Sequence, residues 1–367
     1  MPIVRDAHHR HAAHYLRVVQ TADALFKQGN ENLEEALRIF NANRANIRLG
    51  LGWAAQRSKE DENAAATCSD FPNVGALLFA LVFAPVERFR WLRHAVSAAR
   101  FLCDEEAEGW HTGNTGLVHL HVGNVEAAIG CFEQALAICR KFHNRAGEAR
   151  SFGNLGLAYK ELGHIEKAIE NYEAAVLIIE ETDDRLYLGG LLGNLGSAYS
   201  LLGEHARAIQ YYKRDYQIAR QMGNLRGQAG VLSNISLVYL ATGDYPRAVR
   251  FVERSLSISR RIGDRVAEMG AINSMGLVHL NAGAPHKAVE CFDEMLMIAR
   301  EIEELRGGAN ACFNKSLALT DLGDLNGAVM CAEISLPVYE QLGDSHLKAV
   351  AEHLSKLRQR ISYAHPS

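Results

Sequence analysis

Five asparagines occupy one position of a 40-residue period in this chain. A carboxamide offers two N–H donors and an acceptor oxygen, so it can pair with the main chain of an extended peptide without contacting its side chains. Asparagine costs about 0.5 kcal/mol relative to alanine inside a helix, so its recurrence needs a reason. We expect a peptide-binding ladder; pairing between neighbouring helices, or inheritance by duplication without a role, are the alternatives. The five are Asn114, Asn154, Asn194, Asn234 and Asn314, and Ser274 fills the remaining position.

Neighbouring positions on the same helical face complete the predicted site. Three residues after the asparagine position, Ser197 interrupts a series formed by Leu117, Leu157, Leu237, Leu277 and Leu317. These leucines either line the floor of a groove or belong to the core between repeats. Arg150 lies four residues before Asn154, where its guanidinium could pair with a carboxylate of the ligand. The predicted site comprises the five asparagines with Arg150, Leu157, Leu237 and Leu277.

Other reactive side chains give no enzymatic constellation. His11 and His14 have the spacing of a metal-binding pair on a helix, but no cysteine or carboxylate follows at ligand spacing, so we predict no metal and no cofactor. The sequence contains no G-x-x-x-x-G-K-[ST] motif, and no Ser-His-Asp or Cys-His pairing stands out. The seven cysteines form no CxxC motif and are expected to be small apolar side chains in a reducing compartment. We therefore expect a cytoplasmic, non-enzymatic protein.

The elements that position these residues repeat with the same period. A period between 20 and 50 residues is typical of a solenoid, in which each unit packs only against its neighbours. In the unit 145–184 we expect a first helix over 146–162 capped by Asn144, a glycine stop at Gly163 and a second helix over 165–181. Gly156 in mid-helix indicates a close approach of two helices. The strictest columns are Ala128, Ala168, Ala208, Ala248, Ala288 and Ala328, and Gly123, Gly163, Gly203, Gly243, Gly283 and Gly323.

This pattern resembles the tetratricopeptide repeat (TPR). The resemblance lies in Phe152, Leu155-Gly156, Tyr159, Ala168, Tyr172 and Ala175, and the next unit departs from it where Asp215 replaces the last alanine. It implies an all-α fold, a right-handed α-solenoid of antiparallel helix pairs. The 40-residue form is similar to Pins/LGN-type adaptors and to the arrays of bacterial signal-transducing NTPases. In those adaptors the asparagine position faces the concave surface and binds the partner.

Outside the regular array we expect three further parts. Residues 1–70 would form an N-terminal pair of helices, over 7–27 and 33–57, followed by a mobile polar loop over 58–69. Residues 71–109 would be a degenerate first repeat with helices over 71–82 and 86–103. Six regular units would occupy 110–344, and residues 345–367 would form a capping helix and a tail. The N-terminal pair looks like the linker that joins the NTPase module to the repeats in bacterial regulators of that class.

Composition narrows the kind of partner. A net charge of -4 gives no basic footprint for nucleic acid, and no apolar run reaches the roughly 18 residues of a membrane span. We predict a scaffold that holds an extended peptide or a partner protein, with the oligomeric state open. The alternatives are the ligand-sensing array of a signalling NTPase, with the catalytic part absent from this chain, and a peptide-pheromone receptor.

Overall fold

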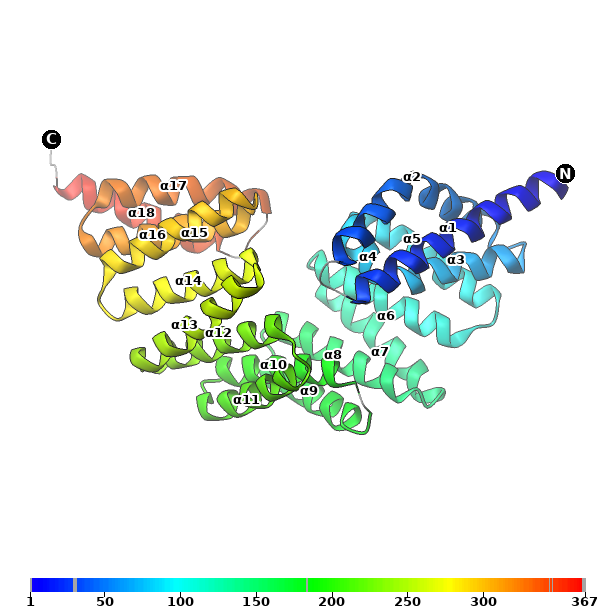
Figure 1. Cartoon of the computed structure of the whole chain (residues 1–367), viewed down its shortest axis with the longest axis horizontal. Helices are drawn as coiled ribbons and strands as arrows, with labels where there is room; N and C mark the ends of the chain where they lie inside the picture. Colours follow the sequence, from blue (N-terminus) through cyan, green and yellow to red (C-terminus); the bar gives the residue numbers. More distant parts are fainter. Residues whose placement is uncertain (1, 29–31, 183, 343, 345, 365–367) are drawn as a thin grey trace. The chain divides into compact units, whose positions relative to one another are not determined.

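The protein is built from helices, and no strand occurs among the residues that the structure describes. The computed structural model describes residues 2–28, 32–182, 184–342, 344 and 346–364 (Figure 1). The helices are α1 (Pro2–Gln28), α2 (Asn32–Arg57), α3 (Glu62–Val74), α4 (Ala76–Val82), α5 (Pro85–Phe101), α6 (Glu105–His121), α7 (Val125–Lys141), α8 (Arg145–Glu161), α9 (Ile165–Ile179), α10 (Arg185–Leu201), α11 (His205–Gln221), α12 (Leu225–Ala241), α13 (Tyr245–Ile262), α14 (Arg265–Asn281), α15 (Pro285–Glu301), α16 (Leu305–Leu322), α17 (Leu325–Leu342) and α18 (Leu347–Ala364).

The chain forms two compact units, Met1–Asp184 and Arg185–Ser367. The first unit contains α1–α9 and the second contains α10–α18. From α6 onward each repeat consists of a helix A and an antiparallel helix B: α6 and α7, α8 and α9, and so on to α16 and α17. Each unit is therefore an α-solenoid, as the sequence pattern predicts.

Successive helices A also pack against one another within each unit. Such contacts join α6 to α8 in the first unit, and α10 to α12, α12 to α14 and α14 to α16 in the second. Contacts between successive helices B are at most marginal in the described part of either unit. Because the more closely spaced row of helices lies on the inner side of a curved stack, helices A line the concave side of each unit.

The repeat of α8 and α9 shows why each helix begins and ends where it does. Asn144 accepts a hydrogen bond from the backbone N–H of Gly147 at 2.9 Å, which caps α8. Gly163 has φ +77°, the left-handed conformation that stops a helix and favours glycine. Helix α9 buries a stripe of small, aliphatic and aromatic side chains at helical spacing: Ala168, Ile169, Tyr172, Ala175, Val176 and Ile179.

The mid-helix glycines leave room for an aromatic ring of helix B. A Cβ atom on Gly156 would lie 2.6 Å from the ring of Tyr172, and the same conflict arises between Gly116 and Phe132, Gly196 and Tyr212, and Gly276 and Phe292. Two repeats have serine in place of the glycine, and there the opposing residue is smaller: Ser236 with Val252, and Ser316 with Ala332. The expected close approach is confirmed, and its cause is the bulk of the opposing ring.

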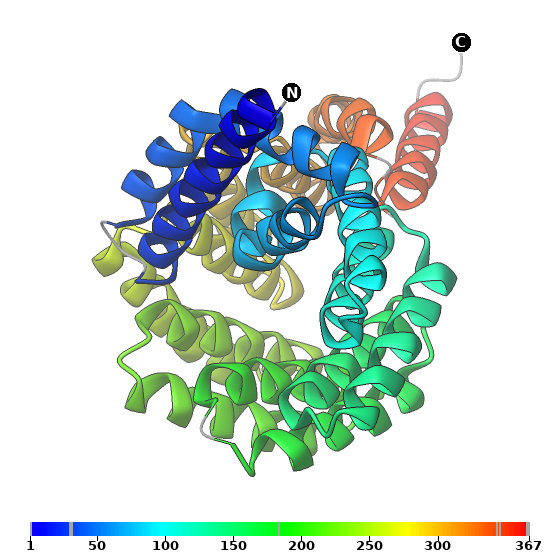
Figure 2. The same ribbon diagram turned by 90° about the vertical axis from the view of Figure 1, so that its right-hand side faces the viewer.

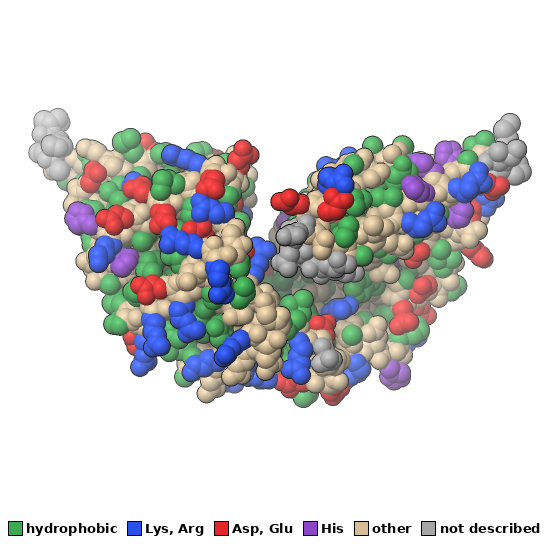
Figure 3. Space-filling model, viewed as in Figure 1, with side chains coloured by type: hydrophobic (Ala, Val, Ile, Leu, Met, Phe, Trp, Pro, Cys, Tyr) green, Lys and Arg blue, Asp and Glu red, His purple; other side chains and the backbone are tan. Residues whose placement is uncertain are grey.

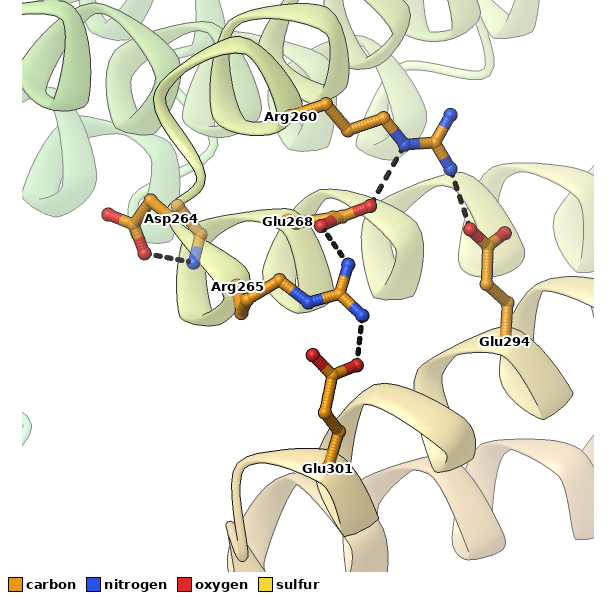
Figure 4. Close-up of polar contacts among 7 residues, drawn as sticks. Arg260, Asp264, Arg265, Glu268, Glu294 and Glu301 are labelled. Carbon is orange, nitrogen blue, oxygen red and sulfur yellow. Dashed lines mark hydrogen bonds and ion pairs between the residues drawn. The ribbon is translucent and has the colours of Figure 1, made fainter.

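Ion pairs tie the start of helix A to the end of helix B in several repeats. Figure 4 shows Arg265 of α14 between Glu268 of the same helix, at 2.5 Å, and Glu301 at the end of α15. Arg145 joins Glu148 and Glu181 in the same way, 120 residues earlier in the sequence. In the repeat of α6 and α7 the two charges are reversed: the acidic residue, Glu105, starts helix A, and the basic residue, Lys141, ends helix B. These pairs help to set the register of the two helices of a repeat.

The N-terminal helices differ from the expectation in two respects. Residues 58–69, predicted to be a mobile polar loop, contain the first turns of α3, which crosses the expected boundary at residue 70. Asp61 caps this helix by accepting from Asn63 N and Ala64 N, and Ala64 and Cys68 are buried. Helix α3 packs against α1, α2 and α5, so burial of its alanine face outweighs its polar composition (Figure 2). The predicted helix over 71–82 is likewise broken at Gly75, between α3 and α4.

Most of the helices expected at the two ends of the array are present. The expected helices over 7–27 and 33–57 correspond to α1 and α2, and the helix over 86–103 corresponds to α5. The first regular repeat begins at Glu105, five residues before the predicted start at 110. Helix α18 covers α17 and buries Val350, Leu354 and Leu357. It therefore supplies the apolar face that a further repeat would otherwise provide.

Candidate functional site

The asparagines predicted to form a ladder lie at equivalent mid-helix positions of helices A. Asn114 is on α6 and Asn154 on α8 in the first unit, whereas Asn194, Asn234 and Asn314 are on α10, α12 and α16 in the second. All five side chains are partly buried. Because helices A form the inner row, the ladder of each unit lies on its concave side.

The hydrogen bonding of these asparagines divides them into two groups. Within the described residues, the carboxamides of Asn154, Asn194 and Asn234 make no hydrogen bond, and the buried Nδ2 of Asn114 has no partner. Asn314 differs, because its Nδ2 donates to Asn273 Oδ1 at 2.8 Å. Pairing between neighbouring helices, the structural alternative, therefore occurs at the C-terminal end of the array.

Within the regular repeats, this division follows the type of the residue that lies 41 positions earlier, on helix A of the preceding repeat. Asn273 occupies that position for Asn314, and Ser233 occupies it for Ser274, whose hydroxyl lies 3.2 Å from that of Ser233. The equivalent residue for Asn154 is Gly113, and for Asn234 it is Gly193. Since glycine has no side chain to pair with, the carboxamides that follow a glycine keep their donors and acceptors available.

The leucines are intermediate between groove and core. Leu237 is 39% exposed on α12, whereas Leu157 and Leu277 are partly buried. Leu277 packs against the cluster of Ala288, Phe292 and Ala318, so it belongs to the core between its own repeat and the next. Of the three, Leu237 therefore offers the most apolar surface to a ligand.

Arg150 pairs with an aromatic ring. Its guanidinium lies over the Trp110 ring at 5.4 Å, and both side chains are exposed. Trp110 lies four residues before Asn114, as Arg150 lies four before Asn154, so the two repeats are linked through equivalent positions. This cation–π pair holds the guanidinium beside the ladder of the first unit, where it can still accept a carboxylate.

A pocket that the sequence did not indicate opens beside Asn114. Its volume is about 120 Å³, and its lining comes from α3, α4, α5 and α6. The lining residues are Pro72, Ala76, Phe79, Ala80, Arg88, Trp91, Leu92, Asn114 and Leu117. The repeat pattern had singled out Asn114 and Leu117 on α6, but no local pattern singled out Arg88 or Trp91. Their meeting depends on how four successive helices, α3 to α6, pack together.

A second unpredicted feature is the carboxyl group of Asp215, in the position where the repeat pattern has alanine. Asp215 makes no hydrogen bond or ion pair within the described residues, and burial raises its pKa to about 6. Its oxygens occupy the space left by Gly189 and Gly193, each of whose Cβ atoms would lie 3.0 Å from a carboxylate oxygen. A cavity of about 220 Å³ adjoins it. The site is therefore suited to a cation or to a neutral hydrogen-bonding group.

Helices α11 and α13 present a basic surface on the side of helices B. They carry nine lysines and arginines against two acidic residues, in a chain whose net charge is -4. Figure 3 shows Lys and Arg side chains gathered over this part of the second unit. A segment that docks on these two helices is favoured when it is acidic. The exposed basic residues are Arg207, Lys213, Arg214, Arg220, Arg247, Arg250, Arg254, Arg260 and Arg261.

The histidines and cysteines hold no metal site within the described residues. His8 and His9 lie beside the Trp53 ring, and His11 and His14 both pack against the Tyr15 ring. All seven cysteines are free; Cys68 and Cys312 are buried, as expected of small apolar side chains, whereas Cys103 is exposed. No helix in the described ranges has the length and apolarity to cross a membrane.

Family models match the central part of the chain. Models described as "Tetratricopeptide repeat" match residues 105–181, 165–221 and 229–262. No curated protein sequence matches the chain significantly.

Three solved structures resemble most of the chain. Aspartyl phosphate phosphatase F from Bacillus subtilis has a TM-score of 0.61 at 12% identity, covering 90% of this chain and 93% of its own. A Rap protein complexed with competence and sporulation factor has a TM-score of 0.59 at 14% identity, with coverages of 94% and 99%. A STAND (Signal Transduction ATPase with Numerous Domains) protein with a tetratricopeptide repeat sensor, from Pyrococcus horikoshii, gives 0.56 at 16% identity, with coverages of 92% and 53%. At these identities the likeness concerns the fold alone.

Proposed function

Because the chain carries tetratricopeptide repeats from residue 105 to residue 262, we propose that it is a non-enzymatic scaffold that holds an extended peptide or partner segment on its helices A. The observation that carries this proposal is the set of unpaired carboxamides at Asn154, Asn194 and Asn234. Three asparagines in mid-helix lower helix stability and return no internal hydrogen bond, so their donors and acceptors are available to a ligand.

The chemistry suits a main chain in extended conformation. A peptide without internal hydrogen bonds exposes one N–H and one C=O per residue, and a carboxamide can satisfy one of each. Repetition along a row of helices adds these bonds without demanding a particular peptide sequence. Leu237 in the second unit and the Trp110–Arg150 pair in the first would then favour particular side chains.

A narrower candidate is a receptor for a short signalling peptide. It is supported by the likeness to the Rap protein complexed with competence and sporulation factor, which extends over 94% of this chain and thus includes the N-terminal helices. The other candidate, the sensor array of a signalling NTPase, is supported by the likeness to the STAND protein, of which this chain covers 53%. Both candidates place the ligand on the repeats, so the same first experiment serves all three.

The test is affinity capture from native lysate with the wild type and with Asn154→Ala/Asn194→Ala/Asn234→Ala, matched for helicity and melting temperature. The control is Asn326→Ala, which removes an exposed asparagine from helix B of the last repeat. We expect partners that bind the wild type and the control but not the triple variant. Partners retained equally by all three proteins would place recognition away from the ladder and refute the proposal.

A further inference from the structure

The pocket beside Asn114 has an apolar interior. Phe79, Trp91 and Leu92 form much of its wall and are each no more than 6% exposed, and Leu117 contributes from α6. Its volume of about 120 Å³ compares with the roughly 150 Å³ of an engineered cavity that binds benzene. The pocket can therefore hold one aromatic ring or one branched aliphatic group.

Two hydrogen-bond donors in this pocket have no partner. Arg88 is partly buried on α5, and it forms no ion pair or hydrogen bond among the described residues. The adjacent carboxylate, Glu87, is already held by Arg48 through bonds of 2.7 and 2.6 Å, so it does not neutralise Arg88. The Nδ2 of Asn114 is buried and also unpaired.

Such an arrangement is costly without a ligand. The Arg88 guanidinium is partly withdrawn from water and has no carboxylate partner in the described structure, and this partial burial lowers the pKa of Arg88. An unpaired buried amide N–H adds a further penalty. The Arg88 guanidinium and the Asn114 Nδ2 are both hydrogen-bond donors, so a single anionic acceptor would satisfy both.

We propose that this pocket binds a carboxylate attached to an apolar body of about the size of a benzene ring. The apolar body packs among Phe79, Trp91 and Leu92, and the carboxylate accepts hydrogen bonds from Arg88 and Asn114. A free small acid and the C-terminal residue of a peptide share this chemistry. Because the walls come from α4 and α5 on one side and from α6 on the other, the ligand ties the degenerate N-terminal repeat to the first regular one.

The test compares acids with their amides on the full chain by calorimetry and thermal shift. We expect phenylacetate to bind with a dissociation constant of about 1 mM or below, and phenylacetamide to bind at least about tenfold more weakly. Arg88→Gln should abolish the preference for the acid, whereas Arg93→Gln, an exposed residue of the same helix, should keep it. Asn114→Ala is a second variant that should reduce the preference, in case Arg88→Gln does not fold.

Each outcome decides the proposal. Equal binding of acid and amide, or an acid preference that survives in Arg88→Gln, would overturn it. Comparison of 4-methylpentanoate with N-acetyl-leucine distinguishes the two sources: tighter binding of the former assigns a free acid, and tighter binding of the latter assigns a peptide C-terminus. The peptide ladder is tested at Asn154, Asn194 and Asn234, which do not line this pocket, so the two proposals fail independently.

Discussion

At the scale of single residues, the chain retains several polar groups that burial penalises. His111 is completely buried on α6, where Ser69 of α3 lies 2.8 Å from its Nε2 and its Nδ1 has no partner. Burial lowers the pKa of His111 to about 4, from 6.5 for a free histidine. The folded protein therefore keeps this imidazole neutral under conditions in which the unfolded chain protonates it.

This difference predicts a pH dependence of stability. Between pH 6.5 and about pH 4 the unfolded state binds the extra proton, so stability that is fully present above pH 6.5 is lost as the pH falls through this window. The group accounts for up to about 3 kcal/mol. We expect the urea midpoint to fall less steeply over this range in His111→Gln than in the wild type. Parallel curves for the two proteins would show that His111 contributes nothing.

Asp215 should produce the opposite effect. Its pKa is raised to about 6, from 3.8, so the penalty of its ionised form is fully present above pH 6 and fades as the pH falls toward 3.8. We expect Asp215→Ala to stabilise the protein by about 1 kcal/mol at pH 7.5, allowing for partial solvent screening. The gain should shrink at pH 4.5. A gain of equal size at both pH values would reflect helix propensity alone, and a loss would indicate that Asp215 has a stabilising partner.

At the scale of helices, the pairing of glycine with an aromatic ring sets the approach of helices A and B. Gly156→Ala should destabilise the first unit by about 1–3 kcal/mol, since the added Cβ would lie 2.6 Å from Tyr172. The matched control is Gly130→Ala on α7, where nothing lies within 4 Å of the new atom. It should stabilise the helix by up to about 1 kcal/mol, because alanine is the better helix former.

Melting curves of both glycine variants, followed by circular dichroism, check this account. Opposite changes in melting temperature are expected. A Gly156→Ala variant that is as stable as Gly130→Ala would mean that the Tyr172 ring moves at no cost, and that the recurrent glycine does not determine helix packing.

The sequence predicted the helices of the regular repeats well, because their start and stop signals are local. Asn144 and Gly163 act through neighbouring backbone groups, and the buried stripe of α9 follows from spacing alone. Helix α3 was missed because its polar first turn resembles a loop. What stabilises it is burial against α1, α2 and α5, and this tertiary effect has no local signature.

At the scale of the whole molecule, the candidate site was predictable in part. The periodicity located the asparagines on one row of helices, but it could not show which of them pair internally. Internal pairing depends on whether the facing residue on helix A of the preceding repeat is glycine, serine or asparagine, and for Asn314 that residue is Asn273. The pocket at Arg88 and the environment of Asp215 likewise arise where side chains of different helices meet, so the pattern of any single helix did not reveal them.

The asparagines of the second unit should differ in what they contribute to binding. Unpaired carboxamides are free to bind a main chain, whereas the donor of Asn314 is already bonded to Asn273. Loss of one ligand hydrogen bond typically costs about 1 kcal/mol, or roughly fivefold in affinity.

The most direct measurement is the affinity of a captured partner, or of its minimal peptide, for three single variants of the second unit, by calorimetry. We expect Asn194→Ala and Asn234→Ala each to weaken binding about fivefold or more, and Asn314→Ala to change it by less than about twofold. Unchanged affinity in Asn194→Ala and Asn234→Ala, with melting temperatures equal to that of the wild type, would contradict the ladder as the site of recognition.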